Sequence, residues 1–476
     1  MNQALYIGSR RELLWDDTLI DTEQSNTVAE LHHPVQRECV LSFSQPWVRK
    51  DGAYNCVLTD GDLHRMYTCL AGKIFYAESR DGIHWEQPNL GLVECDGSTD
   101  NSLVKFEFLP DFEPAGFDGF RVFVDENPAC LPEERYKAIG DMYGKLQIYV
   151  SADGLSFRHV GHLPLRAQHP FTPFDSINTL FFDKNTGKYK AFVRDFYAAP
   201  NPAEPNWVRA ISVTESAELF PKEGWPQAKF LQYSNPNPWQ MYINSIFPYP
   251  RAQHVYVGFP SRYVWRTEWT PNFDELCGAE ARRERAGADG TDRHGISLSD
   301  TLFMTSRDGR FWTRYPEAFL RPGPEHPTNW VYGSVYFSNG LVETEASHPG
   351  CDKELSFYCV ENRFFDVPPQ IYRYSIRMDG FVSQTAPYPE AFLVTKPFIF
   401  EGSDLFINFS TSAFGHMIFT ITDEEGNSIS SDETFGDSTD RRVRFAGDLS
   451  AFAGKPVVLR VKMMEADFYS FQFRNP

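Results

Sequence analysis

The sequence predicts an all-β protein, with a five-bladed β-propeller over residues 1–388 and a β-sandwich over residues 389–476. Three observations lead to this fold class. A strand–turn–strand unit recurs along most of the chain and ends in Ser-x-Asp-Gly-x-x-aromatic. Few segments show the apolar spacing of a helix. Near residues 386–396 the pattern changes to short alternating strands separated by turns, which is typical of sandwiches.

The recurring turn stands at residues 79–85, 151–157 and 306–312, and weaker copies follow strands at 212–216 and 377–381. Asp-Gly favours a tight turn because glycine adopts positive φ without steric penalty. We expect the aromatic residue that follows to hold the outer strand on its sheet.

Each unit also carries an earlier strand, which we expect to be the inner strand of a blade. These strands are predicted at 53–59, 120–124, 179–182, 241–247 and 331–337. Five units of four strands indicate a propeller, with an irregular sandwich assembly as the alternative. The long loop at 265–295 would then belong to a binding rim.

The C-terminal strands are predicted at 405–409, 416–422, 441–445 and 457–461. We expect this sandwich to pack against the propeller; carbohydrate binding is the alternative role. The leader around residues 13–17 is expected to close the ring by pairing with the last blade.

Composition narrows the class of partner. The net charge of −19 makes a nucleic-acid partner unfavourable, because like charges repel. Aromatic residues reach 15%, which suits either strand packing or flat surfaces for sugar rings. The eight cysteines form no CxxC pair, so we expect no metal site, no cofactor and a reducing compartment.

The first residues lack the charged and apolar regions of a signal peptide, and no apolar run of 18 residues exists. We therefore expect a cytoplasmic protein without a membrane partner. Whether it forms a homo-oligomer stays open.

Motifs for nucleotide binding, serine nucleophiles and zinc proteases are absent, which leaves carboxylate chemistry. Glycoside hydrolysis needs one proton-donating carboxyl group and one carboxylate. Asp125 follows the second inner strand, Asp175 precedes the third, and Glu343 follows the fifth. The alternatives are turn capping for the two aspartates and a solvated strand end for Glu343.

Further candidates stand beside the same strands. They are Asp51, Arg194, Arg262 and Asp300 for polar contacts with substrate, and Trp47, Trp239, Tyr242 and Trp330 for stacking on sugar rings. Salt bridges and core packing are the alternative roles.

Several segments resemble a known group. They include Asp125-Glu126-Asn127-Pro128, Phe174-Asp175-Ser176-Ile177-Asn178 and Phe192-Val193-Arg194-Asp195-Phe196. Together they are similar to bacterial glycosyl hydrolase-like propeller proteins related to glycoside hydrolase families 32 and 43. The resemblance implies the same fold and a glycosidase reaction. The Trp-Met-Asn-Asp-Pro-Asn, Arg-Asp-Pro and Glu-Cys motifs of family 32 do not stand here intact, so the resemblance transfers no catalytic trio.

We expect a glycosidase acting on a short oligosaccharide or glycoside, with Asp125 and Asp175 as essential carboxylates and Glu343 as general acid. A phosphorylase using Arg194 and Arg262 for phosphate is one alternative. A non-catalytic carbohydrate-binding propeller is the other.

Overall fold

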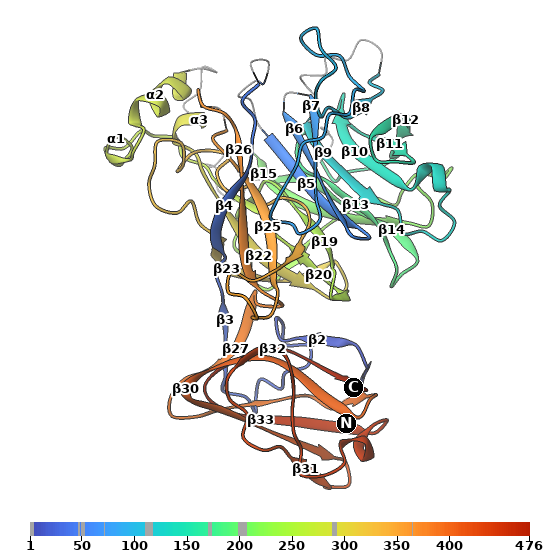
Figure 1. The fold of residues 1–476 in the computed structure, drawn as a ribbon, viewed down its shortest axis with the longest axis vertical. Helices are drawn as coiled ribbons and strands as arrows, with labels where there is room; N and C mark the ends of the chain where they lie inside the picture. The colour runs from blue at the N-terminus through green and yellow to red at the C-terminus, as the bar shows by residue number, and fades with distance from the viewer. Residues whose placement is uncertain are drawn as a thin grey trace.

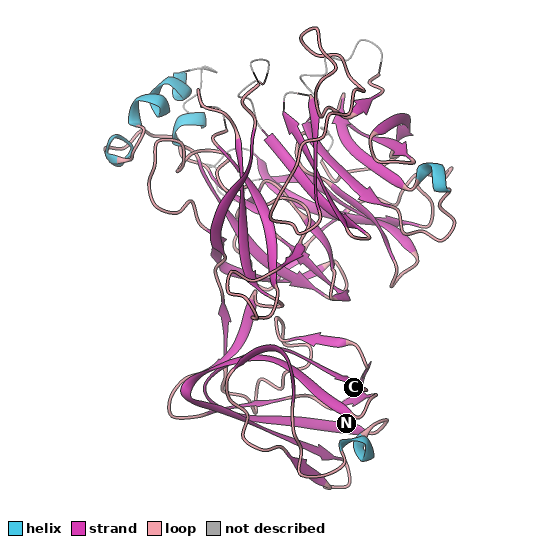
Figure 2. Ribbon diagram, viewed as in Figure 1, coloured by secondary structure: helices cyan, strands magenta, loops and turns pink. Residues whose placement is uncertain are grey.

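The computed structural model describes residues 4–45, 48, 53–70, 72–109, 118–169, 174–198, 207–287, 293–363 and 365–476. The described chain is nearly all β, and its helices are few and short (Figure 2). A propeller-like body contains most of the strands, and a smaller body with both chain termini lies beneath it (Figure 1).

The propeller-like body contains five sheets, which follow one another along the chain. In the order from the inner strand outwards, the first three are β5 (Ala53–Asp60), β6 (Leu63–Leu70), β7 (Lys73–Ser79); β9 (Asp118–Val124), β10 (Tyr136–Met142), β11 (Lys145–Ser151), β12 (Ser156–His162), β8 (Lys105–Phe106); and β13 (Thr179–Asp183), β14 (Lys188–Ala198), β15 (Trp207–Ser216), β16 (Lys229–Phe230).

Of the other two sheets of this body, the fourth has seven strands and the fifth is completed by β4, a strand from the N-terminal part of the chain. They are β19 (Ile246–Tyr249), β20 (Ala252–Gly258), β22 (Leu298–Ser306), β23 (Phe311–Leu320), β17 (Gln232–Tyr233), with β18 (Gln240–Met241) and β21 (Ser261–Val264) alongside; and β24 (Val342–Thr344), β25 (Glu354–Glu361), β26 (Gln370–Arg377), β4 (Val35–Ser42). Since β4 comes from the N-terminal part of the chain and pairs with β26, early and late segments share the last sheet.

Neighbouring sheets contact one another through their inner strands. Strand β5 touches β9, β9 touches β13, and β13 touches β19. The Ser245 hydroxyl beside β19 donates to the carbonyl oxygen of Phe337 at 3.1 Å, and Cys56 of β5 forms a parallel bridge with Asn339. At one end the start of β9 meets the loop before β13, and that loop meets the segment before β19, so these strands start side by side. The Cys56–Asn339 bridge is parallel, so the first and fifth inner segments also run in the same direction there.

The Asp-Gly turns use one set of hydrogen bonds. In the first turn the Gly82 amide donates to Ser79 Oγ at 2.9 Å, and the His84 amide donates to Asp81 Oδ1 at 2.8 Å. The Gly82 carbonyl then accepts a hydrogen bond from the Tyr358 hydroxyl of the last sheet at 2.6 Å. A Cβ on Gly82 would lie 2.7 Å from Val342, so the turn needs glycine for space as well as for its φ of 70°.

The lower body is one hydrogen-bonded system of ten strands. They are β1 (Leu5–Gly8), β2 (Arg11–Leu13), β3 (Val28–Leu31), β27 (Val382–Ala386), β28 (Ala391–Val394), β29 (Phe398–Phe400), β30 (Asp404–Asp423), β31 (Ser428–Ser430), β32 (Asp437–Arg442) and β33 (Pro456–Arg474). The expected boundary at residues 388/389 falls within this system, because β27 before it and β28 after it both pair with β33.

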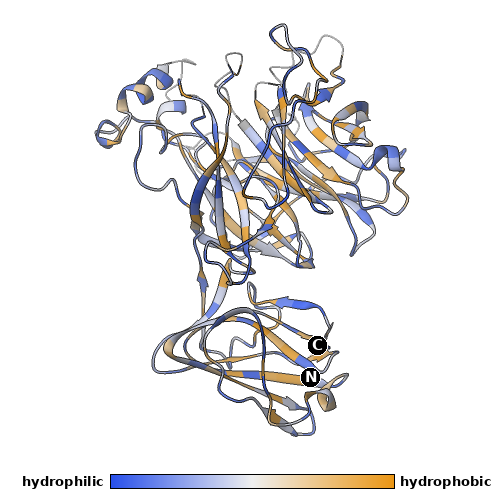
Figure 3. Ribbon diagram, in the orientation of Figure 1, coloured by the Kyte–Doolittle hydropathy of each residue, from blue (hydrophilic) through white to orange (hydrophobic). Residues whose placement is uncertain are grey.

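The leader does not pair as the sequence suggested. Residues Arg11–Leu13 pair with β33, and β4 is the N-terminal strand that joins the last sheet of the propeller-like body. Alternation of apolar and polar residues is visible along the strands (Figure 3), but it identifies a strand without naming its partner.

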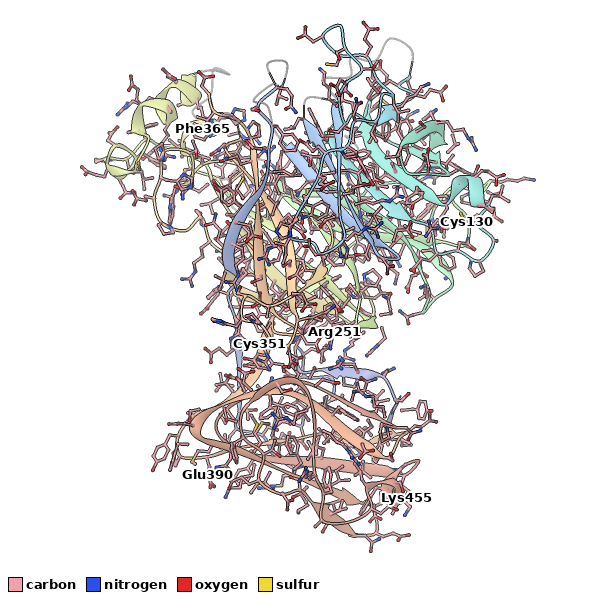
Figure 4. The ribbon with its side chains drawn as sticks, viewed as in Figure 1. Cys130, Arg251, Cys351, Phe365, Glu390 and Lys455 are labelled. Atoms are coloured by element: carbon pink, nitrogen blue, oxygen red, sulfur yellow. The ribbon has the colours of Figure 1, made fainter. Side chains whose placement is uncertain are left out.

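A buried carboxylate joins the two bodies. Asp379 accepts hydrogen bonds from Tyr249 at 2.6 Å and from Arg251 Nε at 2.9 Å, both in the propeller-like body. It also accepts from Ser470 of β33 at 2.7 Å and from Arg11 of β2 at 3.3 Å. Figure 4 labels Arg251 at this junction.

Two expected elements differ from the structure. The fifth inner segment is a series of turns at residues 331–335, and its short strand β24 begins only at Val342. The expected loop 265–295 contains α1 (Asn272–Glu275), α2 (Ala279–Gly287) and the start of α3 (Arg293–Ile296). None of the helices in the described ranges is long and apolar enough to cross a membrane.

Candidate functional site

The candidate site lies at the starts of the inner strands, where a rigid loop presents Asp175. The buried Asn178 donates to the carbonyl oxygens of Phe174 at 3.0 Å and Ser176 at 2.7 Å, so the loop closes on itself. The Ser176 hydroxyl donates to the carbonyl of Tyr242 in the next sheet at 2.8 Å. The side chain of Asp175 is 67% exposed and forms an ion pair with the buried Arg194.

Next to Asp175 lies a set of six side chains that we call the arginine–tyrosine cluster. Its members are Arg194, Arg209, Tyr242, Tyr263, Arg293 and Tyr332. Each guanidinium lies over at least one ring of the set, at 5.0 Å for Arg194 over Tyr242, 4.8 Å for Arg209 over Tyr263 and 4.9 Å for Arg293 over Tyr332.

Hydrogen bonds fix the rings of the cluster. The Tyr332 hydroxyl donates to the Tyr242 hydroxyl at 2.6 Å, and Arg293 Nε donates to the Tyr263 hydroxyl at 3.0 Å. The rings of Tyr242 and Tyr332 meet edge to face at 5.7 Å, a favoured arrangement for aromatic pairs. The rings are buried, and they hold the forked guanidinium donors that can contact polar groups of a ligand.

The cluster concentrates positive charge in a low-dielectric region. Burial lowers the pKa of Arg209, and the nearby charges of Arg194 and Arg293 lower it further. Arg209 itself donates to the amide oxygen of Gln240 at 3.0 Å and to no carboxylate of a described residue.

Asp125 occupies a different place. Its side chain is 0% exposed, pairs with the buried Lys137 at 2.7 Å and accepts a hydrogen bond from the Tyr189 hydroxyl at 2.7 Å. It also accepts from the Asn127 amide at 3.0 Å, which is the turn-capping contact that was the alternative role.

Strand direction separates Asp125 from Asp175. Gly119, at the start of β9, lies so close to the Ser176 carbonyl that a Cβ would be 2.0 Å away. Asp125 stands six residues further along the same strand, roughly 20 Å at about 3.3 Å per residue. A catalytic carboxyl pair is separated by about 5–9.5 Å, so these two aspartates do not form one.

Glu343 lies within the short strand β24. Its carboxylate is 3.8 Å from Arg251 Nη1, and Arg251 in turn contacts Asp379 at the junction of the two bodies. The sequence placed Asp125, Asp175 and Glu343 beside inner strands, and the structure does not bring the three together. Asp125 follows β9, Asp175 precedes β13, and Glu343 lies beside the junction with the lower body.

Three other candidates meet on the fourth sheet. Arg262 forms a two-point ion pair with Asp300, at 2.9 and 2.6 Å, and lies 4.9 Å from the ring of Trp239. Trp239 also lines a cavity of about 150 Å³ together with Arg209 and Arg314. The charges of Arg262 and Asp300 satisfy each other, which is the salt-bridge role named as the alternative.

The remaining candidates divide between the cluster and positions outside the described chain. Tyr242 belongs to the cluster, and its ring is buried. Trp330 donates from its indole to the carbonyl of Gly323 at 2.9 Å. Asp51 and Trp47 lie outside the described residues.

Sequence reasoning missed Arg209 and Arg293. Arg209 stands between apolar residues in the strand Val208-Arg209-Ala210-Ile211, and a charge inside such a run is a usable signal.

No family model matches the chain, and no curated protein matches it. Solved structures similar to it include an exo-β-1,3-galactanase from Phanerochaete chrysosporium, 9% identical, with a TM-score of 0.36 over 94% of this chain and 99% of that one. A GH43 β-1,3-galactosidase is 12% identical, with a TM-score of 0.40 over 84% and 76%. The Bombyx mori GH32 β-fructofuranosidase is 8% identical, with a TM-score of 0.36 over 94% and 95%. These are likenesses to glycoside hydrolases of families 43 and 32, at identities too low to transfer an activity.

Proposed function

We propose that the protein is a glycosidase whose site lies at the starts of the inner strands, with Asp175 as an essential carboxylate. The exposed carboxylate of Asp175, paired with the buried guanidinium of Arg194, carries this proposal. The loop that holds Asp175 touches the start of the neighbouring inner strand, because a Cβ on Gly119 would lie 2.0 Å from the Ser176 carbonyl. Glycoside hydrolysis uses carboxyl groups as acid, base or nucleophile.

In this proposal the residues around Asp175 position it. Arg194 orients the Asp175 carboxylate, and the buried rings of Tyr242 and Tyr332 hold the guanidiniums of the cluster. Asp125 and Glu343 lie outside the reacting site and serve the stability of the sheets.

The test is an activity screen on aryl glycosides and short oligosaccharides. We expect turnover that falls about 10²–10⁴-fold in Asp175→Asn, the usual loss when one acid–base group is removed. The control is Asp125→Asn, which should keep its turnover per folded molecule. Full turnover in Asp175→Asn on the best substrate would refute the assignment.

A glycoside phosphorylase is the second candidate, because the cluster holds more guanidinium groups than carboxylates among the described residues. Phosphorolysis requires inorganic phosphate and releases a sugar phosphate. The same screen with and without phosphate separates the two reactions: turnover without phosphate supports hydrolysis, and strict phosphate dependence supports phosphorolysis.

We further propose that the five smaller sheets are the blades of one ring and that the ten-stranded system folds as a sandwich. Contacts between successive inner strands support the ring. The long strands β30 and β33 pair along most of their length and bury apolar side chains in a common core, which supports the sandwich. All eight cysteines are free thiols, in keeping with the proposed cytoplasmic location.

A further inference from the structure

The arginine–tyrosine cluster differs from several buried cations of the protein, although the buried Arg121 likewise forms no ion pair with a described residue. Lys137 pairs with Asp125 at 2.7 Å, Lys190 with Asp183 at 3.1 Å, and Arg307 with Glu12 at 2.7 Å. Each of these cations has a buried carboxylate, because an uncompensated charge is costly away from water.

In the cluster, by contrast, three guanidiniums face one carboxylate. Asp175 pairs with Arg194, while Arg209 and Arg293 have no ion pair with any described residue. The Nε atoms of Arg194 and Arg209 are buried and have no hydrogen-bond acceptor in the described part of the chain. Counted over the described residues, three positive charges against one negative charge leave an excess of two, in a protein whose net charge is −19.

Another buried arginine shows what a structural arginine looks like here. Arg314 also lies over aromatic rings, at 4.1 Å from Tyr233 and 4.6 Å from Trp239. Its guanidinium, however, donates to the carbonyls of Asn235 at 2.9 Å and Asn237 at 2.8 Å and to the Asn235 side chain. Arg314 therefore has acceptors for both Nε and Nη2, whereas the Nε atoms of Arg194 and Arg209 have none among the described residues.

We propose that the cluster binds an oxyanion carried by the sugar substrate: the carboxylate of a uronate, or a sulfate or phosphate ester. The forked donors of arginine match such groups, and their negative charge supplies what the cluster lacks. The buried rings of Tyr242, Tyr263 and Tyr332 hold the guanidiniums in place. This inference rests on the proposed function for the reacting group, because Asp175 lies next to the cluster through Arg194.

Calorimetric binding tests the inference without needing turnover. The probes are glucuronate, galactose 6-sulfate and glucose 6-phosphate, against neutral glucose and galactose and against inorganic phosphate. The proteins are wild type, Arg209→Gln, Arg209→Lys and the control Arg314→Gln. We expect at least one charged sugar to bind about 10- to 100-fold more tightly than its neutral counterpart, the range of a charge-assisted hydrogen bond.

Arg209→Gln should remove most of that preference, Arg209→Lys should keep part of it, and Arg314→Gln should keep all of it while lowering the melting temperature. If Arg209→Gln fails to fold, the comparison of wild type with Arg209→Lys still decides. Equal binding of charged and neutral sugars overturns the inference, as does inorganic phosphate binding alone with no effect of charge on the sugar.

The outcomes also separate this inference from the proposed function. A preference for charged sugars without any turnover upholds the oxyanion site and removes the glycosidase. Turnover restricted to neutral glycosides upholds the glycosidase and removes the oxyanion site.

Discussion

Replacing Asp125 by Asn should destabilise the protein while leaving its site intact. The side chains of Asp125 and Lys137 are 0% and 3% exposed, so the variant leaves a buried ammonium group without its counter-charge. Breaking such a pair costs about 3–5 kcal/mol. The lower end applies here, because Lys137 keeps the Glu134 carbonyl at 3.0 Å and asparagine can still accept from Tyr189.

The size of the thermal shift follows from the length of the unfolding unit. At about 2.1 cal/mol/K per residue, roughly 380 residues give an unfolding entropy near 0.8 kcal/mol/K, so a loss of about 3 kcal/mol lowers the melting temperature by about 4 °C. Lys137→Met added to Asp125→Asn should restore at least half of the loss, since both charges are then gone.

Differential scanning calorimetry of wild type, the single variant and the double variant measures these shifts, and turnover per folded molecule is measured on the same preparations. The reasoning is refuted if Asp125→Asn melts within 1 °C of wild type, or if it loses turnover in proportion to a catalytic residue while staying folded.

Two further predictions concern acid stability and thiol reactivity. Burial alone would raise the pKa of Glu12, but the hydrogen bond from His254 and the charge of Arg307 lower this pKa to about 2, against 4.5 for a free glutamate. Glu12 therefore stabilises the fold above about pH 4.5, and about 3 kcal/mol of the free energy of unfolding is lost as the pH falls towards 2. We expect Glu12→Gln to flatten this part of the pH profile measured by urea denaturation. An unchanged profile would contradict the contacts of Glu12. The exposed thiols of Cys39, Cys277 and Cys351 should react with an aromatic disulfide reagent in the native protein. Burial raises the pKa of Cys56 to about 11, so Cys56 and the buried Cys359 should react only after unfolding. Rapid reaction of more than five thiols would disagree with the observed burial.

Local chemistry allowed much of the fold to be predicted. The Ser-x-Asp-Gly turn contains its own hydrogen-bond partners, so residues 79–85 specify the turn without help from the rest of the chain. Strand alternation likewise located β5, β9 and β13 to within a few residues. The prediction of a fifth inner strand was wrong at residues 331–335. Val331 and Tyr332 are buried in turns there, and the spacing of apolar residues alone does not distinguish a buried turn from a strand.

The site was harder to predict because it depends on direction. Asp125 follows β9, whereas Asp175 precedes β13, so the two residues lie at opposite ends of neighbouring inner strands. The sequence pattern shows that a residue flanks a strand, but two residues share a site only when they lie at the same end of the neighbouring strands. The cluster was missed for a related reason. Arg209 and Arg293 meet rings from β21 and from the turn after residue 330, and no local pattern indicates contacts over such separations.

The pairing of the first strands with the last one has a consequence for synthesis of the chain. Residues Arg11–Leu13 pair with residues 470–472, which are synthesised only after the whole propeller-like body. The early segment must therefore stay unpaired and accessible to chaperones until then. Removing the final twenty residues should leave the first strands as exposed edges, so a nascent or truncated chain is at greater risk of aggregation than one whose ends fold locally.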